Sequence, residues 1–264
     1  MNVTYRASTT IASSDFKNST QAFIFSDYAK NVTHKNNASN DLQASVRDRS
    51  FRSNRITSDL FLTAQKEFGD FTVDGLIGQS FRQTTSKQVD MNGNNLIIPT
   101  LFNVSNRTGE PGVGEFNTKT RLIGVFGKLA FGYKDWAFIE FTGRNDWDSR
   151  LPQNSLSFFY PGGSASFVLS NAISSLKNSS TISYLKVRGS VSKSGNVNLD
   201  PYSLEANYAV APGFPYGSLP GFQSATIVNN PSIKPEFVLS KEVGFELSMF
   251  RNRVNLEVTG YLQN

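Results

Sequence analysis

The sequence contains no cysteine among its 264 residues and a single histidine, His34. Without cysteine there can be no disulfide bond, no thiolate metal site and no thiol nucleophile. A histidine triad or zinc site would depend on His34 alone, which lies in the polar stretch "NVTHKNN" and is typical of a solvated loop. The glycine-rich "GEPGVGEF" lacks the Lys-Ser/Thr of a phosphate-binding loop. We therefore expect no metal site and no cofactor.

Long apolar runs are also missing. The longest, such as "LIIP" and "WAFI", are far shorter than the ~18 residues of a membrane helix. The first residues, "MNVTYRASTT", show no basic segment followed by an apolar one, so no signal peptide is visible. Either the protein is cytosolic or its true N-terminus is missing. The net charge of +5 comes from scattered Lys and Arg, which argues against nucleic-acid binding.

Phenylalanine, glycine and small polar residues are abundant instead: 22 residues are Phe, and Asn, Ser and Thr crowd the stretches between short apolar segments. This composition favours β-strands joined by long polar loops. In "TRLIGVFGKLAFGYKDW", Ile123, Val125 and Leu129 lie on one parity, a period-2 pattern typical of a strand. The next alternating run follows the two-residue break Lys134-Asp135, which predicts a hairpin.

The same alternation predicts about eight or nine strands. Several alternate for about 10 residues or more, the length that a tilted strand needs to cross a bilayer. A soluble sandwich would also alternate, so the pattern alone does not decide between them. The predicted strands cover residues 1–8, 55–68, 71–84, 121–133, 136–144, 157–169, 184–193, 238–250 and 254–264.

The predicted connections alternate between very short and very long, as in membrane barrels with short periplasmic turns and long extracellular loops. The long ones cover roughly 85–120, 145–156 and 194–237, and the segment 170–183 is expected to form a brief helix or an irregular piece on the short-turn side. Aromatic residues flank the short turns, which favours a membrane–water interface there. These aromatics are Phe68, Phe71, Tyr133, Trp136 and Phe250.

Several stretches in the second half resemble the barrel of the SusC/RagA-type TonB-dependent outer-membrane transporters. They are "YKDWAFIEFTGRNDWDSRLP", "FFYPGGSASFVLSNA", "YLKVRGSVSKSGN" and "NPSIKPEFVLSKEVGFELSMFRNRVNLEVTGYLQN". The last is similar to the family's Asn-Pro-x-Leu-Lys-Pro-Glu run, with Ile233 in place of its leucine. The resemblance is dense over 121–264, thinner over 55–120 and weak before residue 55.

This resemblance implies an all-β fold: an antiparallel transmembrane β-barrel segment of about 8–10 strands, taken from a plugged barrel of the 22-stranded kind. The whole of 1–264 would be partial barrel domain, with the plug domain absent. An odd strand count, a final strand that runs into Asn264 and the lack of an export signal also suggest a fragment. The implied location is the outer membrane. The implied partners are outer-membrane lipid, a TonB complex acting through the missing plug, and a SusD-type surface lipoprotein.

The stretch "GRNDWDSRLP", residues 143–152, is expected to leave a strand tip and enter an extracellular loop. Three hypotheses compete for it. In the first, Arg144 points into the lumen, and Asp146 and Asp148 pair with Arg144 and Arg150 in a structural junction. In the second, the stretch binds ligand: Trp147 stacks on a sugar or peptide side chain, and the site comprises Arg144, Asn145, Asp146, Trp147 and Arg150. In the third, Asp146 and Asp148 are a glycosidase acid/base pair, which an open loop does not favour.

The predicted function is therefore a fragment of a nutrient import receptor for oligosaccharides or peptides, not an enzyme. The alternative is a secreted β-sandwich adhesin or carbohydrate-binding module. Charged residues on the inward parity are expected to pair with one another around the inner wall. They are Asp74, Arg82, Lys128, Glu140, Lys186, Arg188, Glu242 and Glu246.

Overall fold

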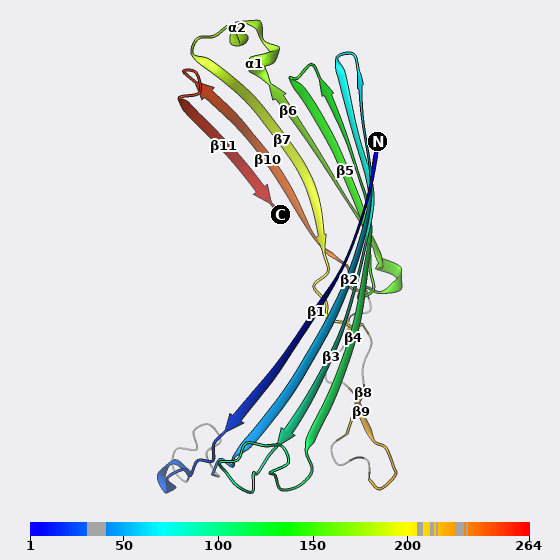
Figure 1. Ribbon diagram of the computed structural model, residues 1–264, viewed down its shortest axis with the longest axis vertical. Helices are drawn as coiled ribbons and strands as arrows, with labels where there is room; N and C mark the ends of the chain where they lie inside the picture. The colour runs from blue at the N-terminus through cyan, green and yellow to red at the C-terminus, as the bar shows by residue number, and fades with distance from the viewer. Residues whose placement is uncertain (31–40, 205–207, 212–213, 215, 225–229, 231) are drawn as a thin grey trace. The chain divides into compact units, whose positions relative to one another are not determined.

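The computed structural model describes residues 1–30, 41–204, 208–211, 214, 216–224, 230 and 232–264, so His34 lies outside the described residues. Nine strands form one sheet in the order β1-β2-β3-β4-β5-β6-β7-β10-β11, and β8 and β9 form a small separate ribbon (Figure 1). The strands of the large sheet are β1 (Asn2–Thr20), β2 (Ser45–Phe68), β3 (Phe71–Gly93), β4 (Gly112–Tyr133), β5 (Ala137–Asp148), β6 (Ser157–Val168), β7 (Ile182–Asn196), β10 (Glu236–Met249) and β11 (Val254–Gln263). The ribbon consists of β8 (Tyr208–Val210) and β9 (Phe222–Ser224).

Short and long connections fall at opposite ends of the strands, as predicted. We call the end with the turns β2–β3, β4–β5 and β10–β11 the turn end, and the opposite end the loop end. Two single-turn helices, α1 (Leu169–Ala172) and α2 (Ser174–Lys177), join β6 to β7 at the turn end (Figure 1), where the sequence predicted a brief helix. At the loop end a 3-10 turn, η3 (Gln153–Ser155), follows β5. No helix among the described residues is long and apolar enough to cross a membrane.

The strand boundaries correct the sequence prediction at the loop end. β1 runs to Thr20 and β2 begins at Ser45, inside the stretch 9–54 that sequence patterning left largely unassigned. The loop predicted over 85–120 is shorter, because β3 reaches Gly93 and β4 begins at Gly112. These extensions are mostly polar, and their few apolar residues, such as Ile11 and Phe16, fall on both parities. They therefore carry no sustained period-2 signal from which a strand could be predicted.

The β4–β5 turn contains three residues, 134–136, rather than the predicted two. Lys134 and Asp135 adopt the left-handed region, with φ of 45° and 58°, and the Trp136 amide donates to the Tyr133 carbonyl at 3.1 Å. The Lys134 Nζ lies 3.1 Å from the Asp70 carboxylate in the neighbouring β2–β3 turn. That carboxylate raises the pKa of Lys134. Two consecutive turns are thus joined by an ion pair.

The large sheet presents two different faces. One cross-strand row pairs Glu140 with Ser164, Ser164 with Ser190 and Ser190 with Glu242, and we call this parity the polar face. The next row runs across the strands through successive pairs, and we call its parity the apolar face. Its members are Phe131, Ile139, Ala165, Gly189 and Val243. Large apolar side chains on this face are exposed, among them Phe141 at 56% and Val243 at 72%. A surface of this kind needs an apolar environment.

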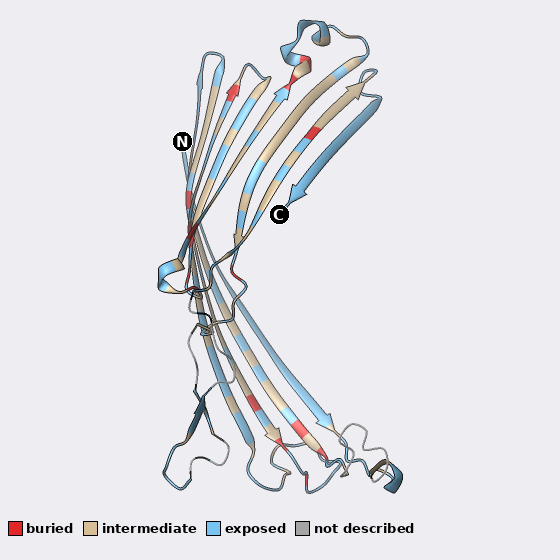
Figure 2. Cartoon of the chain, turned by 180° about the vertical axis from the view of Figure 1, so that it is seen from behind, coloured by how far each residue is buried: buried red, intermediate tan, exposed pale blue. Residues whose placement is uncertain are grey.

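The chain divides into two compact units, which are described separately. The first comprises 1–8, 57–82 and 120–264, and the second comprises 9–56 and 83–119. Buried apolar side chains form only two small clusters among the described residues, one in each unit (Figure 2). In the second unit, Ala44, Val46 and Leu96 pack together. In the first, Leu151, Phe158 and Val197 do so beside the end of β5.

The second unit also contains a buried carboxylate that sequence reasoning missed. Asp90 is 4% exposed and accepts hydrogen bonds from Arg49 Nε at 2.7 Å, Gln88 Nε2 at 2.8 Å and Arg47 Nε at 3.3 Å. Arg47 and Arg49 belong to β2 and Asp90 to β3, so this cluster ties the loop-end parts of the two strands together. Only the cross-strand register brings residues so far apart in sequence into contact.

Candidate functional site

The last residues of strand β5 place three charged side chains on the polar face. Arg144, Asp146 and Asp148 are two residues apart in an extended strand, so their side chains share one side of the sheet. Asn145 and Trp147 lie on the apolar face between them. The predicted site residues up to Trp147 are therefore part of β5 rather than of a loop, which corrects the sequence prediction. Only Arg150 belongs to the connection that follows.

Asp146 is the centre of the first group of contacts. It is 5% exposed, and its carboxylate accepts hydrogen bonds from Arg144 Nε at 2.8 Å and from the Tyr160 hydroxyl on β6. Arg144 also donates from Nη2 to Ser80 Oγ on β3 at 2.9 Å. Its guanidinium lies 5.1 Å from the centroid of the Phe126 ring on β4. One buried ion pair therefore connects four adjacent strands.

Gly124 on β4 makes room for this ion pair. It pairs directly with Asp146 across the β4–β5 ladder. A Cβ built at this position would collide with Arg144 Nη2 and Asp146 Oδ1. The absence of a side chain here is thus a local requirement of the Arg144–Asp146 geometry.

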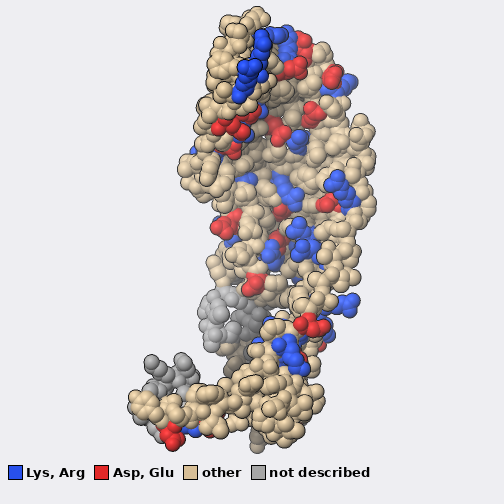
Figure 3. Space-filling view, turned by 60° about the vertical axis from the view of Figure 1, so that its left-hand side comes forward, with Lys and Arg blue, Asp and Glu red and all other residues tan. Residues whose placement is uncertain are grey.

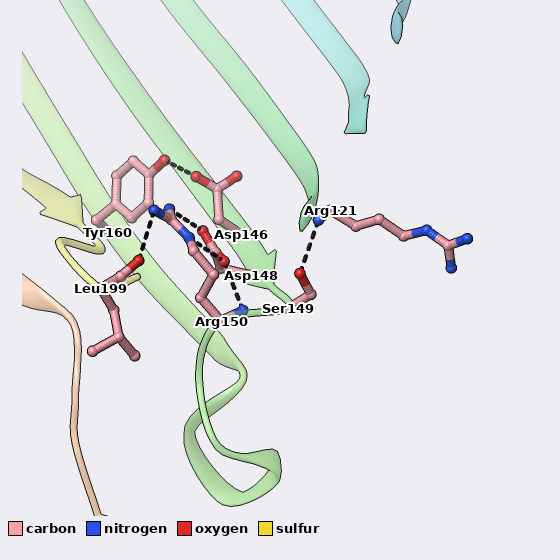
Figure 4. Close-up of polar contacts among 7 residues, drawn as sticks. All are labelled: Arg121, Asp146, Asp148, Ser149, Arg150, Tyr160 and Leu199. Carbon is pink, nitrogen blue, oxygen red and sulfur yellow. Dashed lines mark hydrogen bonds and ion pairs between the residues drawn. The ribbon is translucent and has the colours of Figure 1, made fainter. Parts of the chain in front are cut away.

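Asp148 and Arg150 form the second group of contacts (Figure 4). Asp148 is 3% exposed and accepts hydrogen bonds from Arg150 Nη2 at 2.7 Å and from Arg150 Nε and backbone N at 2.9 Å each. Arg150 Nη1 donates to the Leu199 carbonyl at 3.3 Å. The hydrogen bond with Asp148 raises the pKa of Arg150, so this guanidinium stays charged at any physiological pH. The pair fastens the long β7–β10 connection to the end of β5.

The remaining two predicted site residues make few contacts. Asn145 Nδ2 donates to Ser157 Oγ at 2.9 Å, and Trp147 is 36% exposed on the apolar face. The structure thus brings Arg144, Asp146 and Arg150 to the polar side of the wall but does not bring Asn145 and Trp147 to that side. A ligand-binding role for the five residues stays a prediction.

The paired aspartates do not have the geometry of a glycosidase site. Each carboxylate is buried and bound by an arginine. In a glycosidase, the two catalytic carboxyl groups must instead face one scissile bond from opposite sides, with room for the substrate between them. The predicted structural junction, with Asp146 paired to Arg144 and Asp148 to Arg150, is confirmed by these contacts.

The polar face carries further ion pairs towards the turn end, where basic and acidic side chains are interspersed (Figure 3). Lys128 pairs with Glu140 at 3.3 Å and Lys186 with Glu246 at 3.2 Å. Arg188 lies 2.9 Å from Glu257 and 3.6 Å from Glu242. The predicted pairing of inner-wall charges is confirmed for these residues. Asp74 and Arg82 make no ion pair within the described ranges.

The polar face is also hollowed beside the β5 cluster. A depression of about 380 Å³ is lined by Thr142, Arg144, Tyr160 and Ser192, among others. A second, of about 220 Å³, lies beside Lys186, Arg188 and Glu242. No group of three or more His, Asp or Glu residues in the described part of the chain could hold a metal ion. The site consists of hydrogen-bonding groups on a wall.

A sheet with one lipid-compatible face and one charged face is what a membrane β-barrel wall requires. A family model described as "TonB dependent receptor-like, beta-barrel" matches residues 2–264. The chain belongs to this family. TonB-dependent receptors are transport proteins of the outer membrane, not enzymes.

Curated TonB-dependent receptors of Formosa agariphila are similar to the chain. TonB-dependent receptor P26 is 25% identical over 257 residues, which cover 94% of this chain and 25% of the relative. TonB-dependent receptor P39 is 28% identical over 211 residues, which cover 77% of this chain and 20% of the relative. The chain thus spans about a quarter or less of the length of these receptors.

Solved structures of a peptide transporter have the same fold. The structure of the RagAB peptide transporter matches with a TM-score of 0.76 and 18% identity, covering 99% of this chain and 28% of the other. The RagAB peptide importer in the "closed-closed" state matches with a TM-score of 0.78 at 18% identity and the same coverage. At this identity the likeness concerns the fold of the TonB-dependent receptor barrel alone.

Proposed function

We propose that the chain forms part of the barrel wall of an outer-membrane receptor. This receptor imports a nutrient with energy delivered through TonB. The observation that carries this is the two-faced sheet itself. Its apolar face exposes Phe141 and Val243, while its polar face carries paired charges such as Arg144–Asp146. Such a wall separates lipid from a hydrophilic path, which is what an import receptor needs.

Within this proposal the whole of 1–264 is barrel domain, and the moving parts are supplied by other segments of the receptor. Energy would reach the receptor through a plug that contacts the TonB complex, and a SusD-type lipoprotein would cover the loop end. The likeness to the RagAB peptide transporter supports a peptide substrate. Oligosaccharides are the second substrate class.

Substrate contact at the polar face would involve Arg144, Asp146 and Arg150. Because the two arginines are already paired with Asp146 and Asp148, they would offer hydrogen bonds rather than an unbalanced charge. This favours a neutral or zwitterionic ligand over a strongly anionic one. Asn145 and Trp147 face the other way and would need a ligand outside the lumen.

The β-sandwich alternative finds no support, because a sandwich buries its apolar faces between two sheets. The described residues form one large sheet, and large side chains of its apolar face, such as Phe141 and Val243, are exposed.

The test is uptake by cells that carry the complete receptor. We expect cells to accumulate a labelled peptide or oligosaccharide pool, and to lose this uptake when the receptor gene is deleted or the proton-motive force is dissipated. Uptake that is unchanged in both conditions would contradict the import function. Comparing the two pools decides the substrate class.

A further inference from the structure

The apolar face changes character beyond Ile123 on β4 and at the loop end of β5 and β6. From the turn end upward it carries Leu129, Phe141 and other apolar side chains, glycine or proline. It then carries Arg121 on β4, Asn145 and Trp147 on β5, and Phe159 on β6. Register places them side by side: Ile123 pairs with Trp147, and Asn145 with Phe159. The backbone amide of Ser149 donates to the Arg121 carbonyl at 2.9 Å.

Arg121 points away from the buried Asp148–Arg150 pair, although it lies on the adjacent strand (Figure 4). On β10, Lys241 is a cation within the apolar parity, between Val243 and Leu239, and it pairs with Val191 and Leu262. Lys193 does not belong to this set: its Nζ lies 3.8 Å from the centroid of the Phe237 ring, which packs with the buried Phe158 cluster.

A row of aromatic rings marks the turn end of the same face. Phe71 and Tyr133 have centroids 4.7 Å apart, Tyr133 and Trp136 are 5.6 Å apart, and Trp136 and Phe167 are 6.3 Å apart. Four rings, from β3, β4, the β4–β5 turn and β6, therefore form one continuous row. Aromatic rows of this kind lie at a membrane–water interface.

The spacing of the two ends matches the thickness of a membrane. β5 runs from Ala137 to Trp147 without interruption. Ten steps of ~3.3 Å at a tilt of ~45° rise by roughly 23 Å, close to the ~25 Å apolar band of outer-membrane barrels. The same arithmetic gives roughly 28 Å from Tyr133 to Arg121 and roughly 19 Å from Met249 to Lys241. Long cationic side chains can extend along an apolar surface to reach a headgroup layer.

We propose that Arg121, Trp147 and Lys241 bind the phosphate-bearing headgroups of lipids in the outer leaflet. Both charged members of the set are cations, so they complement a layer of phosphates. The indole of Trp147 has an apolar body for the acyl chains and an N–H donor for a headgroup oxygen. Trp147 is then a lipid contact rather than a platform for the transported ligand. This holds whether or not the receptor imports the proposed nutrients.

The first experiment measures the depth of Trp147 in the complete receptor reconstituted in bilayers. The emission of Trp147 is obtained as the difference between the wild type and Trp147→Phe, and that of Trp136 in the same way from Trp136→Phe. We expect lipids brominated near the headgroup to quench both residues more strongly than lipids brominated at the chain ends. Quenching of Trp147 by aqueous iodide but not by either lipid would overturn the proposal.

The second experiment measures phosphate recognition through thermal unfolding. We expect a diphosphorylated glycolipid to raise the unfolding temperature more than its dephosphorylated form, because binding to the folded state stabilises it. The double variant Arg121→Gln, Lys241→Gln should lose this difference. Lys66→Gln should keep it, because Lys66 is a cation stacked 4.8 Å from the Phe68 ring at the turn end.

Other outcomes of this experiment contradict the proposal. Equal stabilisation by both glycolipids would show that phosphate is not recognised. The same rise with inorganic phosphate alone would show a free-anion site. Loss of lipoprotein binding in the double variant, with the lipid effect intact, would assign the surface to a protein partner.

Discussion

At the scale of single residues, the end of β5 is organised by charge burial. Asp146 and Asp148 are nearly inaccessible to solvent, and each is compensated by an arginine two residues away. A buried carboxylate is tolerated only when its oxygens are hydrogen-bonded. Alternation predicted these pairs from the sequence, because residues i and i+2 share one face of a strand. The bonds to Tyr160 and Ser80 depend on cross-strand register and could not be predicted.

The substitution Asp146→Asn should destabilise the receptor measurably. It leaves Arg144 without its anion and weakens the bond from Tyr160, so we expect a loss of about 1–3 kcal/mol in the free energy of unfolding. Glu140→Gln is the matched control, since its pair with Lys128 is exposed and should contribute under about 1 kcal/mol. Denaturant unfolding in bilayers measures both, and equal losses would contradict the argument.

Gly124→Ala should disturb the same ion pair from the opposite strand. The new methyl group would occupy space held by Arg144 and Asp146, so we expect a loss of about 1–3 kcal/mol in the free energy of unfolding. At Gly127 the nearest atom to an added Cβ is the Leu76 carbonyl at 3.5 Å, so Gly127→Ala is the control and should cost much less. Unfolding curves recorded side by side test the contrast.

At the scale of elements, strand ends beyond the membrane are stabilised by polar contacts instead of lipid. Asp90 gathers Arg47, Arg49 and Gln88. Asp41, before β2, accepts a hydrogen bond from the Phe25 amide at 3.0 Å and pairs with Lys30 at 2.6 Å. Neither group shows a sequence pattern. In water both faces of a strand can be polar, and period-2 patterning then disappears.

The β1–β2 connection should loosen in acid because of Asp41. The hydrogen bond with Lys30 lowers the pKa of Asp41 below its usual value. Its stabilising effect is therefore complete above about pH 3.9 and is lost as the pH falls through the lower pKa of the folded state. The protection factor of the Phe25 amide against hydrogen exchange should therefore fall in that range.

Asp41→Asn should show the reduced protection factor of Phe25 already at neutral pH. Asp27→Asn is the control, because Asp27 makes no ion pair within the described residues of this connection. A protection factor at Phe25 that is insensitive to both pH and Asp41→Asn would show that the carboxylate does not hold the segment.

At the scale of the whole molecule, the sequence predicted the nine strands, the two ends and the two faces, because lipid on one side and charge on the other impose strict alternation. It could not predict the β8–β9 ribbon, whose strands have three residues each. It also placed Trp147 and Asp146 in one ligand site, although a strand sends neighbouring side chains to opposite faces. Recognising that β5 continues to Asp148 separates them.

The two faces should respond very differently to one charge. Phe141→Arg puts a cation near the middle of the apolar face and should cost about 2–4 kcal/mol in the free energy of unfolding. Thr142→Arg puts the same side chain on the polar face beside a depression of about 380 Å³ and should cost far less. Unfolding in bilayers compares them. Equal costs would show that Phe141 does not contact lipid.

The hydrogen bond from Arg150 to the Leu199 carbonyl has a mechanical consequence. The β7–β10 connection is anchored three residues after β7 ends, so its free span begins at the rim of the wall and not at the strand terminus. A force applied to that span is transmitted through Arg150 and Asp148 into β5, and from β5 through the backbone ladder to β4 and β6. The rim therefore acts as a fixed pivot for the β7–β10 connection. Anything that the connection binds is held at a defined distance from this pivot.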